Sequence, residues 1–237
     1  MARQVRSEVT RRKILDAAID VFGEVGYAAA AWGTIIERTG MTKGALYHHF
    51  DSKESLASDI IDEGSEALLA AFGNACGPGS PALENMIHGT FAIANVISVD
   101  KTARAAEQLT AVLSGFNEAA ARSYASWVEG MAAQARRAIA EGDLRDDVDP
   151  DLFSQAIVGA MIGTRLLTIA MSGGRTNDQL AEELSRRLRQ IWAFLLPGVA
   201  AEASLPYFEQ FLAREAFRHT RTAAPTAGTD PVVAESG

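Results

Sequence analysis

The chain has 237 residues, of which 48% are hydrophobic, and it carries a formal net charge of -8. That length and apolar content suffice for a buried core, which excludes a wholly disordered chain. The single cysteine, Cys76, excludes a disulfide framework and a thiolate zinc site, and it fits a reducing cytosol.

Charge is distributed unevenly along the chain. The first 53 residues hold eight Lys and Arg against six Asp and Glu, whereas the rest hold 14 against 24. The two parts therefore carry net charges of +2 and -10. The cations near the start are Arg3, Arg6, Arg11, Arg12 and Lys13. This cluster could neutralise phosphates, or it could be no more than the solvated start of a helix.

No segment of the sequence predicts export or membrane insertion. The amino terminus is basic but lacks the apolar block and cleavage site of a signal peptide. The most apolar run, 156–171, contains Arg165 and is shorter than the roughly 20 residues that a spanning helix requires. We therefore expect a cytoplasmic protein with no membrane partner.

Three short helices are predicted in the first 52 residues. Apolar residues recur at helical spacing over 8–24, and Gly26 suits the end of that helix. A second helix is predicted over 32–39, and a third begins near Lys43 with Thr42 as its N-cap. Two short helices joined by a tight turn form a helix-turn-helix. The predicted shared core consists of Ile14, Phe22, Ile35, Leu46 and Phe50.

The third helix has an outward face that suits DNA. Leu46 and Phe50 are four residues apart, so both can lie on the buried side. The residues left facing outward are Lys43, Gly44, Tyr47 and His48. A cation, a glycine that admits a phosphate or backbone, and amphipathic rings together favour double-stranded DNA as the ligand.

The rest of the chain predicts only helices. They are expected over 53–72, from Pro81 after an N-cap at Ser80, over 100–113, 117–142 and 150–173, from Thr176 to Leu196 before Pro197, and over 205–218. We find no strand pattern, so the predicted fold class is all-α. The predicted domains are a helix-turn-helix domain over 1–52, a larger helical ligand-binding and dimerisation domain over 53–219, and a disordered tail over 220–237.

Two stretches resemble a known family. FGEVGY at the end of the first helix, followed by IIERTGMTKGALYHHFDSKESL, resembles the DNA-binding domain of TetR-family bacterial repressors over 11–56. The resemblance implies a palindromic DNA operator, with Thr42, Lys43, Tyr47, His48 and Lys53 on phosphates or base edges and Gly44 admitting the backbone. Arg3 and Arg6 of the basic cluster are added because they could neutralise phosphates. Together these residues are the predicted DNA-binding residues. One departure is the run 28–31, all alanine, where the family usually caps the second helix with Thr or Ser.

Two later helices predict a homodimer. Gly159 and Gly163 are four residues apart, so another helix could approach closely. The following helix offers Leu184, Leu188, Ile191, Trp192 and Leu195 at matching spacing. A pair of helices from each subunit could form a four-helix interface. The alternative is ordinary packing within one subunit.

The middle helices predict a pocket for a small lipophilic effector. Their aromatic and sulfur-containing residues include Met86, Phe91, Tyr124, Trp127, Met131 and Met161, with Gln108, Gln134 and Thr164 as polar groups. Such residues can also simply fill a core. The segments MARQVRSEVTR, SYASWVEGM and VGAMIGTRLL resemble the γ-butyrolactone receptor branch of the TetR family. That resemblance implies that Trp127 lies against a lactone-like or furan-like effector, and we interpret Arg165 as a buried ion-pair residue.

Nothing in the sequence predicts an enzyme. His48, His49 and Asp51 are close in sequence, but adjacent residues of a helix point about 100° apart, and no HExxH spacing is present. We therefore expect no catalytic residue, cofactor or metal. Two alternatives to an effector-controlled repressor stay open, namely a TetR-like regulator without an effector and a helical protein-interaction module.

Overall fold

The computed structural model describes residues 2–77, 79–171 and 177–221, and every regular element among them is a helix. The helices are α1 (Ala2–Ala29), α2 (Trp32–Thr39), α3 (Lys43–His49), α4 (Lys53–Ala75), α5 (Ala82–Val99), α6 (Lys101–Leu113), α7 (Glu118–Glu141), α8 (Pro150–Ala170), α9 (Asn177–Val199) and α10 (Leu205–Arg221). A single antiparallel bridge joins Leu144 to Ala200 within these residues. The predicted all-α fold is confirmed.

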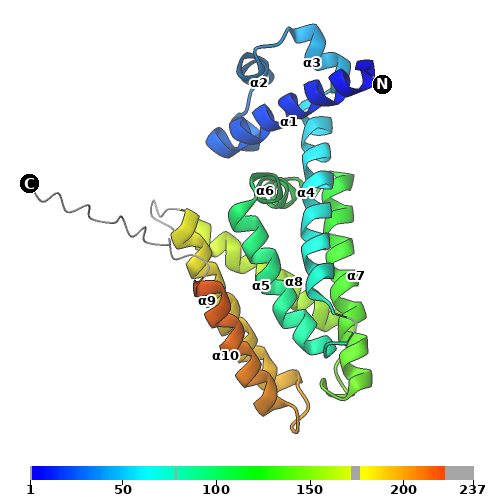
Figure 1. The fold of residues 1–237 in the computed structure, drawn as a ribbon, viewed down its shortest axis with the longest axis vertical. Coiled ribbons are helices and arrows are strands. Elements are labelled where there is room, and N and C mark those ends of the chain that lie inside the picture. Colours follow the sequence, from blue (N-terminus) through cyan, green and yellow to red (C-terminus); the bar gives the residue numbers. More distant parts are fainter. Residues whose placement is uncertain (1, 78, 172–176, 222–237) are drawn as a thin grey trace, which may run out of the picture.

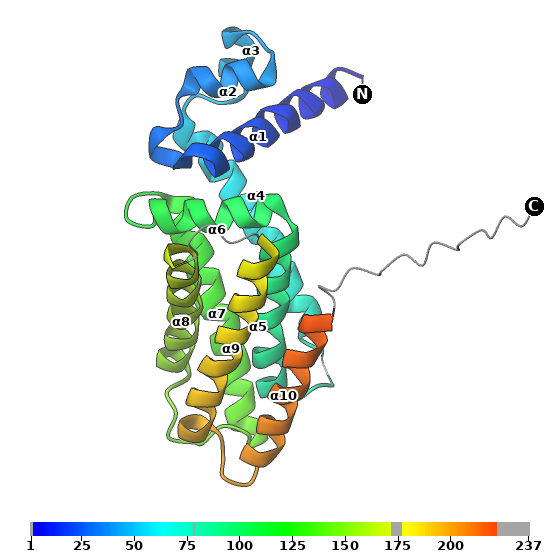
Figure 2. The same cartoon turned by 90° about the vertical axis from the view of Figure 1, so that its left-hand side faces the viewer.

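The helices form two groups joined by α4. Helices α1, α2 and α3 lie at one end of the molecule, and α4 runs from them into the larger group beside α7 (Figure 1). Helix α6 lies across the top of the larger group, beneath α1, and contacts both α1 and α4 (Figure 2). Helices α8, α9 and α10 complete the larger group on the side away from α4.

Glycines and caps set the helix ends close to their predicted places. The backbone of α1 breaks at Gly26, which has a φ of 76°, and α2 ends before Gly40 with a φ of 67°. At the start of α3 the Oγ1 atom of Thr42 accepts a hydrogen bond from the amide of Ala45 at 3.3 Å. The start of α2 has no side-chain cap, because Ala31 occupies the N-cap position.

Several predicted helix boundaries were wrong. Helix α4 continues past position 72 to Ala75, and α8 ends at Ala170, before Gly173. The N-cap of α5 is Pro81 and not Ser80, and a carboxylate oxygen of Glu141 accepts the hydrogen bond of the Ala82 amide at 2.7 Å instead. Helix α9 continues past Pro197 to Val199. Proline removes only one amide donor there, and the amide of Ala200 still donates to the carbonyl of Leu196 at 2.9 Å.

Several sequence predictions fall outside the described residues. These are the capping role of Thr176 and most of the predicted tail, 222–237. The boundary between the two domains at residue 52 also stays a prediction. The hydrophobic core of α1–α3 continues into α6, since Leu109 and Leu113 pack in the same cluster as Leu46.

The predicted core of the first domain is confirmed. Ile14, Ile35 and Leu46 are fully buried, and Phe22 and Phe50 are at most 5% exposed. A second core lies in the larger group of helices around Trp192, whose indole Nε1 donates to the hydroxyl of Thr90 at 3.0 Å.

Helix α8 is the one described helix that is long and apolar enough, by length and composition, to cross a membrane. A third of its most apolar window is buried inside the protein, with Phe153, Ile157 and Val158 in the core. Core helices of soluble proteins meet the same criteria, so this is weak support for a membrane span.

Candidate DNA interface and effector pocket

The third helix presents the face that its sequence predicts. Leu46 is fully buried and anchors α3 against the core. The outward residues are Lys43, Gly44, Tyr47 and His48, all of them exposed. Because the anchor is rigid and the face is polar, α3 can present these four residues to a groove without disturbing the core.

Tyr47 is held in place by an aromatic neighbour from the preceding helix. Its ring centre lies 5.6 Å from that of Trp32 in α2, at an interplanar angle of 55°. The ammonium nitrogen of Lys43 also lies 5.6 Å from the centre of the Tyr47 ring. Tyr47 is nevertheless 44% exposed, so its contacts orient a side chain that remains accessible to a ligand.

Gly44 faces open space. A Cβ atom added at Gly44 would meet no atom of the protein within 4 Å. Packing within the chain therefore gives no reason for a glycine here, although a glycine weakens a helix by roughly 0.5–1 kcal/mol relative to alanine. Close approach of an external group, such as a phosphate, would supply that reason.

The basic cluster at the start of α1 is smaller than predicted. Arg11 forms an ion pair with Asp59 at 2.5 Å, and Arg12 is bonded to Asp16 at 3.0 Å and to Glu63. The pKa of Arg12 is raised, chiefly by its hydrogen bond to Asp16. These two guanidinium groups hold α1 against α4 and are not free for phosphates. Arg6 and Lys13 are exposed, whereas the side chain of Arg3 lies outside the described residues.

Lys53 has partners within the protein, and its predicted DNA contact stays a prediction. Its ammonium group donates to the carbonyl oxygens of Tyr27 at 2.8 Å and Ala30 at 3.1 Å, and it lies 4.4 Å from the centre of the Tyr27 ring. These carbonyls follow the break at Gly26 and have no helical partners. Lys53 thus links the start of α4 to the end of α1. Its side chain is long enough to reach the last carbonyl groups of α1 and donate hydrogen bonds to them.

The two histidines at the end of α3 pack against each other. The rings of His48 and His49 are 5.4 Å apart, edge to face. Burial lowers the pKa of His49, and the charges of His48 and Arg11 lower it further. Among the described residues, no group of three or more His, Cys, Asp and Glu side chains could hold a metal ion.

Trp127 lies between two small apolar hollows in the larger domain. One, of about 30 Å³, is lined by Trp127 with Met161 of α8 and Leu188 of α9. The other, of about 10 Å³, lies between Trp127 and Met131. The indole Nε1 of Trp127 is buried and has no hydrogen-bond partner among the described residues. The structure therefore brings together three of the predicted effector residues.

The other predicted effector residues do not line these two hollows. Met86 and Phe91 are buried in the core, and the side-chain oxygen of Gln134 accepts a hydrogen bond from Asn85 at 3.2 Å. Tyr124 and Thr164 are also absent from both linings, and so is Gln108, which is exposed on α6. Helical spacing could not separate these residues from Trp127, since it does not fix which helix packs on which face.

A buried ion pair forms part of the wall beside Trp127. The guanidinium Nε of Arg165 in α8 donates to a carboxylate oxygen of Glu107 in α6, and their side chains are only 13% and 18% exposed. Burial raises the pKa of the Glu107 carboxyl, and the charge of Arg165 acts against that rise. The ion-pair role predicted for Arg165 is confirmed. Its partner was not predicted, because a single sequence does not indicate which acid on another helix meets the arginine.

Comparison with known proteins identifies the family to which this chain belongs. The model of the tetR family of bacterial regulatory proteins matches residues 14–60, and that of tetracyclin-repressor-like C-terminal domains matches residues 80–201. The chain belongs to the TetR family. Its helix-turn-helix, formed by α2 and α3, is the element that the first model covers, so this TetR-family chain is a DNA-binding transcriptional regulator.

Its relatives indicate the branch within the TetR family. The A-factor receptor protein of Streptomyces griseus is 31% identical over 200 residues, which cover 84% of this chain and 67% of that protein. A crystal structure of a γ-butyrolactone receptor, an ArpA-like protein, superposes with a TM-score of 0.73 at 26% identity, covering 90% and 99% of the two chains. CprB of Streptomyces coelicolor, solved in complex with its biological operator sequence, gives 0.70 at 28% identity, with the same coverage. The predicted resemblance to γ-butyrolactone receptors is confirmed.

The TetR-family chain leaves one face of α8 and α9 uncovered. On α8 the positions 152, 156, 159, 163 and 166 share a stripe in which Leu152 and Leu166 are each 65% exposed. A Cβ atom added at Gly159 or Gly163 would meet nothing within 4 Å. On α9, Phe194 is 83% exposed.

The residues predicted to form the α9 side of a dimer interface mostly face inward. Leu184, Leu188 and Trp192 are at most 7% exposed and pack in the core of their own chain. The correction follows from helical phase, because the apolar face of α9 is covered by α5 and α8 of the same chain, which the sequence does not show. The outward face contains Phe194 in place of those residues.

Proposed function

We propose that this chain is a homodimeric transcriptional repressor that binds a palindromic DNA operator and is released by a small lipophilic effector. The observation that carries the DNA part is the exposed face of α3, with Lys43, Gly44, Tyr47 and His48 directed away from a rigid core. Arg6 on α1 adds an exposed cation on the same domain. Thr42, with Arg3, remains a proposed phosphate contact, and Lys53 supports the domain from within.

Dimerisation is supported by the uncovered face of α8 and α9. The stripe of small and apolar residues on α8, with Phe194 beside it, can pack against the same surface of a second copy. A twofold axis makes such an interface self-complementary. Two recognition helices related by that axis would read half-sites about one DNA turn apart, roughly 34 Å.

Effector control is supported by the position of α6 between the two domains. Lys101 at the start of α6 lies 3.4 Å from Asp16 and 3.5 Å from Asp20 of α1, and Arg12 donates to the hydroxyl of Thr102 at 3.3 Å. A ligand that enlarges the hollow at Trp127 would move α6 and, through these contacts, α1. Release then follows if the ligand binds more tightly to the conformation that fits DNA poorly.

The printed names of the relatives support the chemical class of the effector. The relatives are receptors for A-factor and γ-butyrolactone, so we propose a lactone-like or furan-like molecule for this chain. The relatives are regulators and not enzymes, which points away from catalysis, and we place the protein in the cytoplasm. One observation favours a second candidate, a regulator without an effector, because the hollow at Trp127 measures only about 30 Å³.

The decisive experiment is fluorescence anisotropy with the DNA upstream of the protein's own gene, across a salt series, with and without a lipid extract of the source cells. Tight binding that weakens steeply with salt and is reversed by the extract supports the full proposal. Binding that no extract alters favours the effector-free regulator. The variant Tyr47→Ala should lose operator binding and remain dimeric, whereas Tyr207→Ala, which removes an exposed tyrosine of α10, should bind normally. Normal binding by Tyr47→Ala would disprove the proposed recognition face.

A further inference from the structure

Arg165 lies where three hollows of the protein meet. It lines the small hollow beside Trp127, a hollow of about 130 Å³ between α5, α6, α8 and α9, and a cleft of about 290 Å³. The lining of the 130 Å³ hollow is mostly apolar, and we call it the polar hollow because Arg104, Gln108 and Arg165 line it. The cleft is bounded by α1 on one side and by α6 and α8 on the other. The last two hollows adjoin, since Gln108, Arg165 and Ile169 line both.

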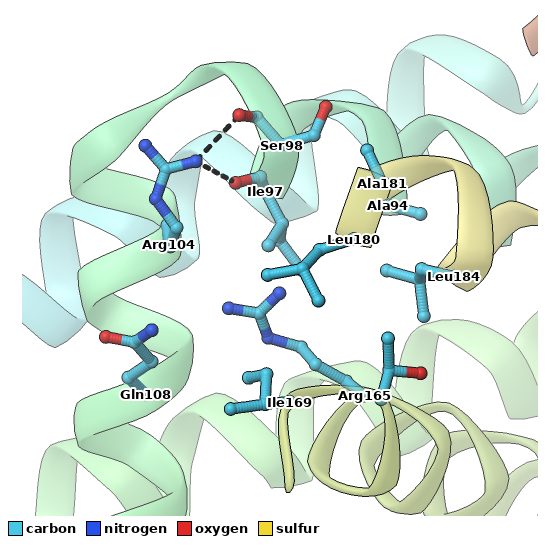
Figure 3. Close-up of a pocket in the computed structure, with 11 residues that line it drawn as sticks. Ala94, Ile97, Ser98, Arg104, Gln108, Arg165, Ile169, Leu180, Ala181 and Leu184 are labelled. Atoms are coloured by element: carbon cyan, nitrogen blue, oxygen red, sulfur yellow. Dashed lines mark hydrogen bonds between the residues drawn. The ribbon is translucent and has the colours of Figure 1, made fainter. Parts of the chain in front are cut away.

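The guanidinium group of Arg165 has unused hydrogen-bond donors. Its Nε donates to Glu107, while its two terminal amino groups have no partner among the described residues. Figure 3 shows these amino groups in the middle of the polar hollow, near Ile97 of α5 and Leu180 of α9. The end of a guanidinium offers two parallel N–H donors, which match the two oxygens of a carboxylate.

A second arginine adds positive charge to the same hollow. One terminal nitrogen of Arg104 donates to the carbonyl oxygens of Ile97 at 3.1 Å and Ser98 at 2.7 Å, which fixes this side chain at the wall (Figure 3). The amide of Gln108 lies one turn further along α6. No acidic residue is among the described side chains that line the polar hollow, and the nearby Glu107 is already paired. The hollow is therefore suited to an anion.

The adjoining cleft is suited to an apolar chain. Its walls include Phe22 and Tyr27 from α1, Val112 from α6 and Leu166 from α8. A cleft of about 290 Å³ can hold an alkyl chain of medium length. One amphipathic molecule could thus place its head group in the polar hollow and its tail in the cleft.

We propose that the junction between the two domains binds a medium-chain carboxylic acid. Its carboxylate lies between Arg165 and Arg104, and its alkyl chain lies between α1 and the helices α6 and α8. The head-group end of this site adjoins the hollow beside Trp127 through Arg165, but the alkyl chain lies in the cleft and not against Trp127. Since its two walls belong to different domains, the acid binds best at one spacing of the domains, and its binding and that of DNA influence each other reciprocally.

Isothermal titration calorimetry with decanoate and decanamide tests the proposal. The two probes share an alkyl chain and differ in charge, so we expect decanoate to bind at least about tenfold more tightly. Val112→Trp fills the cleft from a position that is 57% exposed, which keeps the core intact. Arg165→Lys retains the positive charge beside Glu107 but removes the two parallel N–H donors of the guanidinium group. Each variant should weaken decanoate binding at least about tenfold, whereas Trp127→Ala should leave it unchanged.

Three results would overturn the inference. Equal affinity for decanoate and decanamide would exclude an anionic head-group site. Loss of binding in Trp127→Ala with normal binding in Val112→Trp would place the acid in the interior hollow. No measurable binding of decanoate at millimolar concentration would exclude the site itself. Operator binding by the unmodified protein is measured separately, so each of these results leaves the proposed repressor function standing.

Discussion

The ammonium nitrogen of Lys53 lies 2.8 Å from the carbonyl oxygen of Tyr27 and 4.4 Å from the centre of the Tyr27 ring. This contact ties the first residue of α4 to the end of α1, so the orientation of the DNA-binding helices depends on the helix that enters the larger domain. The resemblance to TetR repressors had implied a phosphate contact for the same lysine. A structural role and a phosphate contact of Lys53 predict different dependences of operator affinity on salt concentration.

Lys53→Met should therefore destabilise the protein by about 1.5–3 kcal/mol, the usual contribution of hydrogen bonds to a charged group. Operator affinity should fall while the slope of log K against log salt stays the same. Lys43→Met is the comparison, because loss of a phosphate contact lowers that slope by about one. If Lys53→Met lowers the slope as much as Lys43→Met does, Lys53 contacts a phosphate, as the sequence predicted.

Gly44→Ala separates stability from DNA binding. The added methyl group meets nothing within the protein, so helix propensity should raise the free energy of unfolding by about 0.5–1 kcal/mol. Operator affinity should fall at least about tenfold if a phosphate or sugar approaches the backbone there. Gly73→Ala, at another open helical position, is the matched control and should change stability alone. Unchanged operator affinity in Gly44→Ala would remove this glycine from the interface.

Phe194→Asp should give a folded monomer. Phe194 is 83% exposed, so the substitution leaves the core untouched and places a charge on the proposed dimer surface. Light scattering after size-exclusion chromatography should show half the mass of the unmodified protein, and operator affinity should drop. Phe116→Asp, which changes a 69% exposed phenylalanine after α6, should stay dimeric. A dimeric Phe194→Asp would argue against the α8 and α9 face.

Trp127→Phe tests the effector pocket with little change in packing. It should keep operator affinity and lose most of the response to an active lipid extract, because the phenyl ring covers less of the hollow. Trp192→Phe is the control. Trp192 is fully buried and lines neither hollow, so the loss of its hydrogen bond to Thr90 and of part of its packing should lower stability and leave the response intact. A normal response from Trp127→Phe would exclude this residue from the pocket.

The lowered pKa of His49 predicts a pH dependence of stability. The pKa of an unperturbed histidine is about 6.5, and burial lowers the pKa of His49 in the folded protein, so the unfolded chain binds more protons just below that pH. The stabilisation from neutral His49 is therefore complete above that pH and is lost as the pH falls through the folded pKa. His49→Gln should flatten this dependence in urea unfolding measured between pH 7.5 and 5.5. A profile identical to that of the unmodified protein would assign the pH effect to other groups.

Local features of the sequence determined most of the secondary structure. Gly40 and Gly142, both with positive φ, end their helices where the sequence places them, and Thr42 and Asp100 cap theirs. Leu46 and Phe50 fixed the outward face of α3, because a short helix with one apolar side has a single way to pack. The DNA-binding domain and its recognition face therefore followed from interactions between residues close in sequence.

Only the tertiary structure decided the arrangements that depend on contacts between distant helices. On α9, packing places Trp192 in the core and leaves Phe194 on the surface, although the two aromatic residues are only two positions apart. Likewise Glu107 meets Arg165 across 58 positions of the sequence, and Lys53 reaches carbonyl groups that are free only because α1 breaks at Gly26. Helical periodicity fixes which residues share a face, whereas the neighbour of that face is fixed by how all the helices pack together.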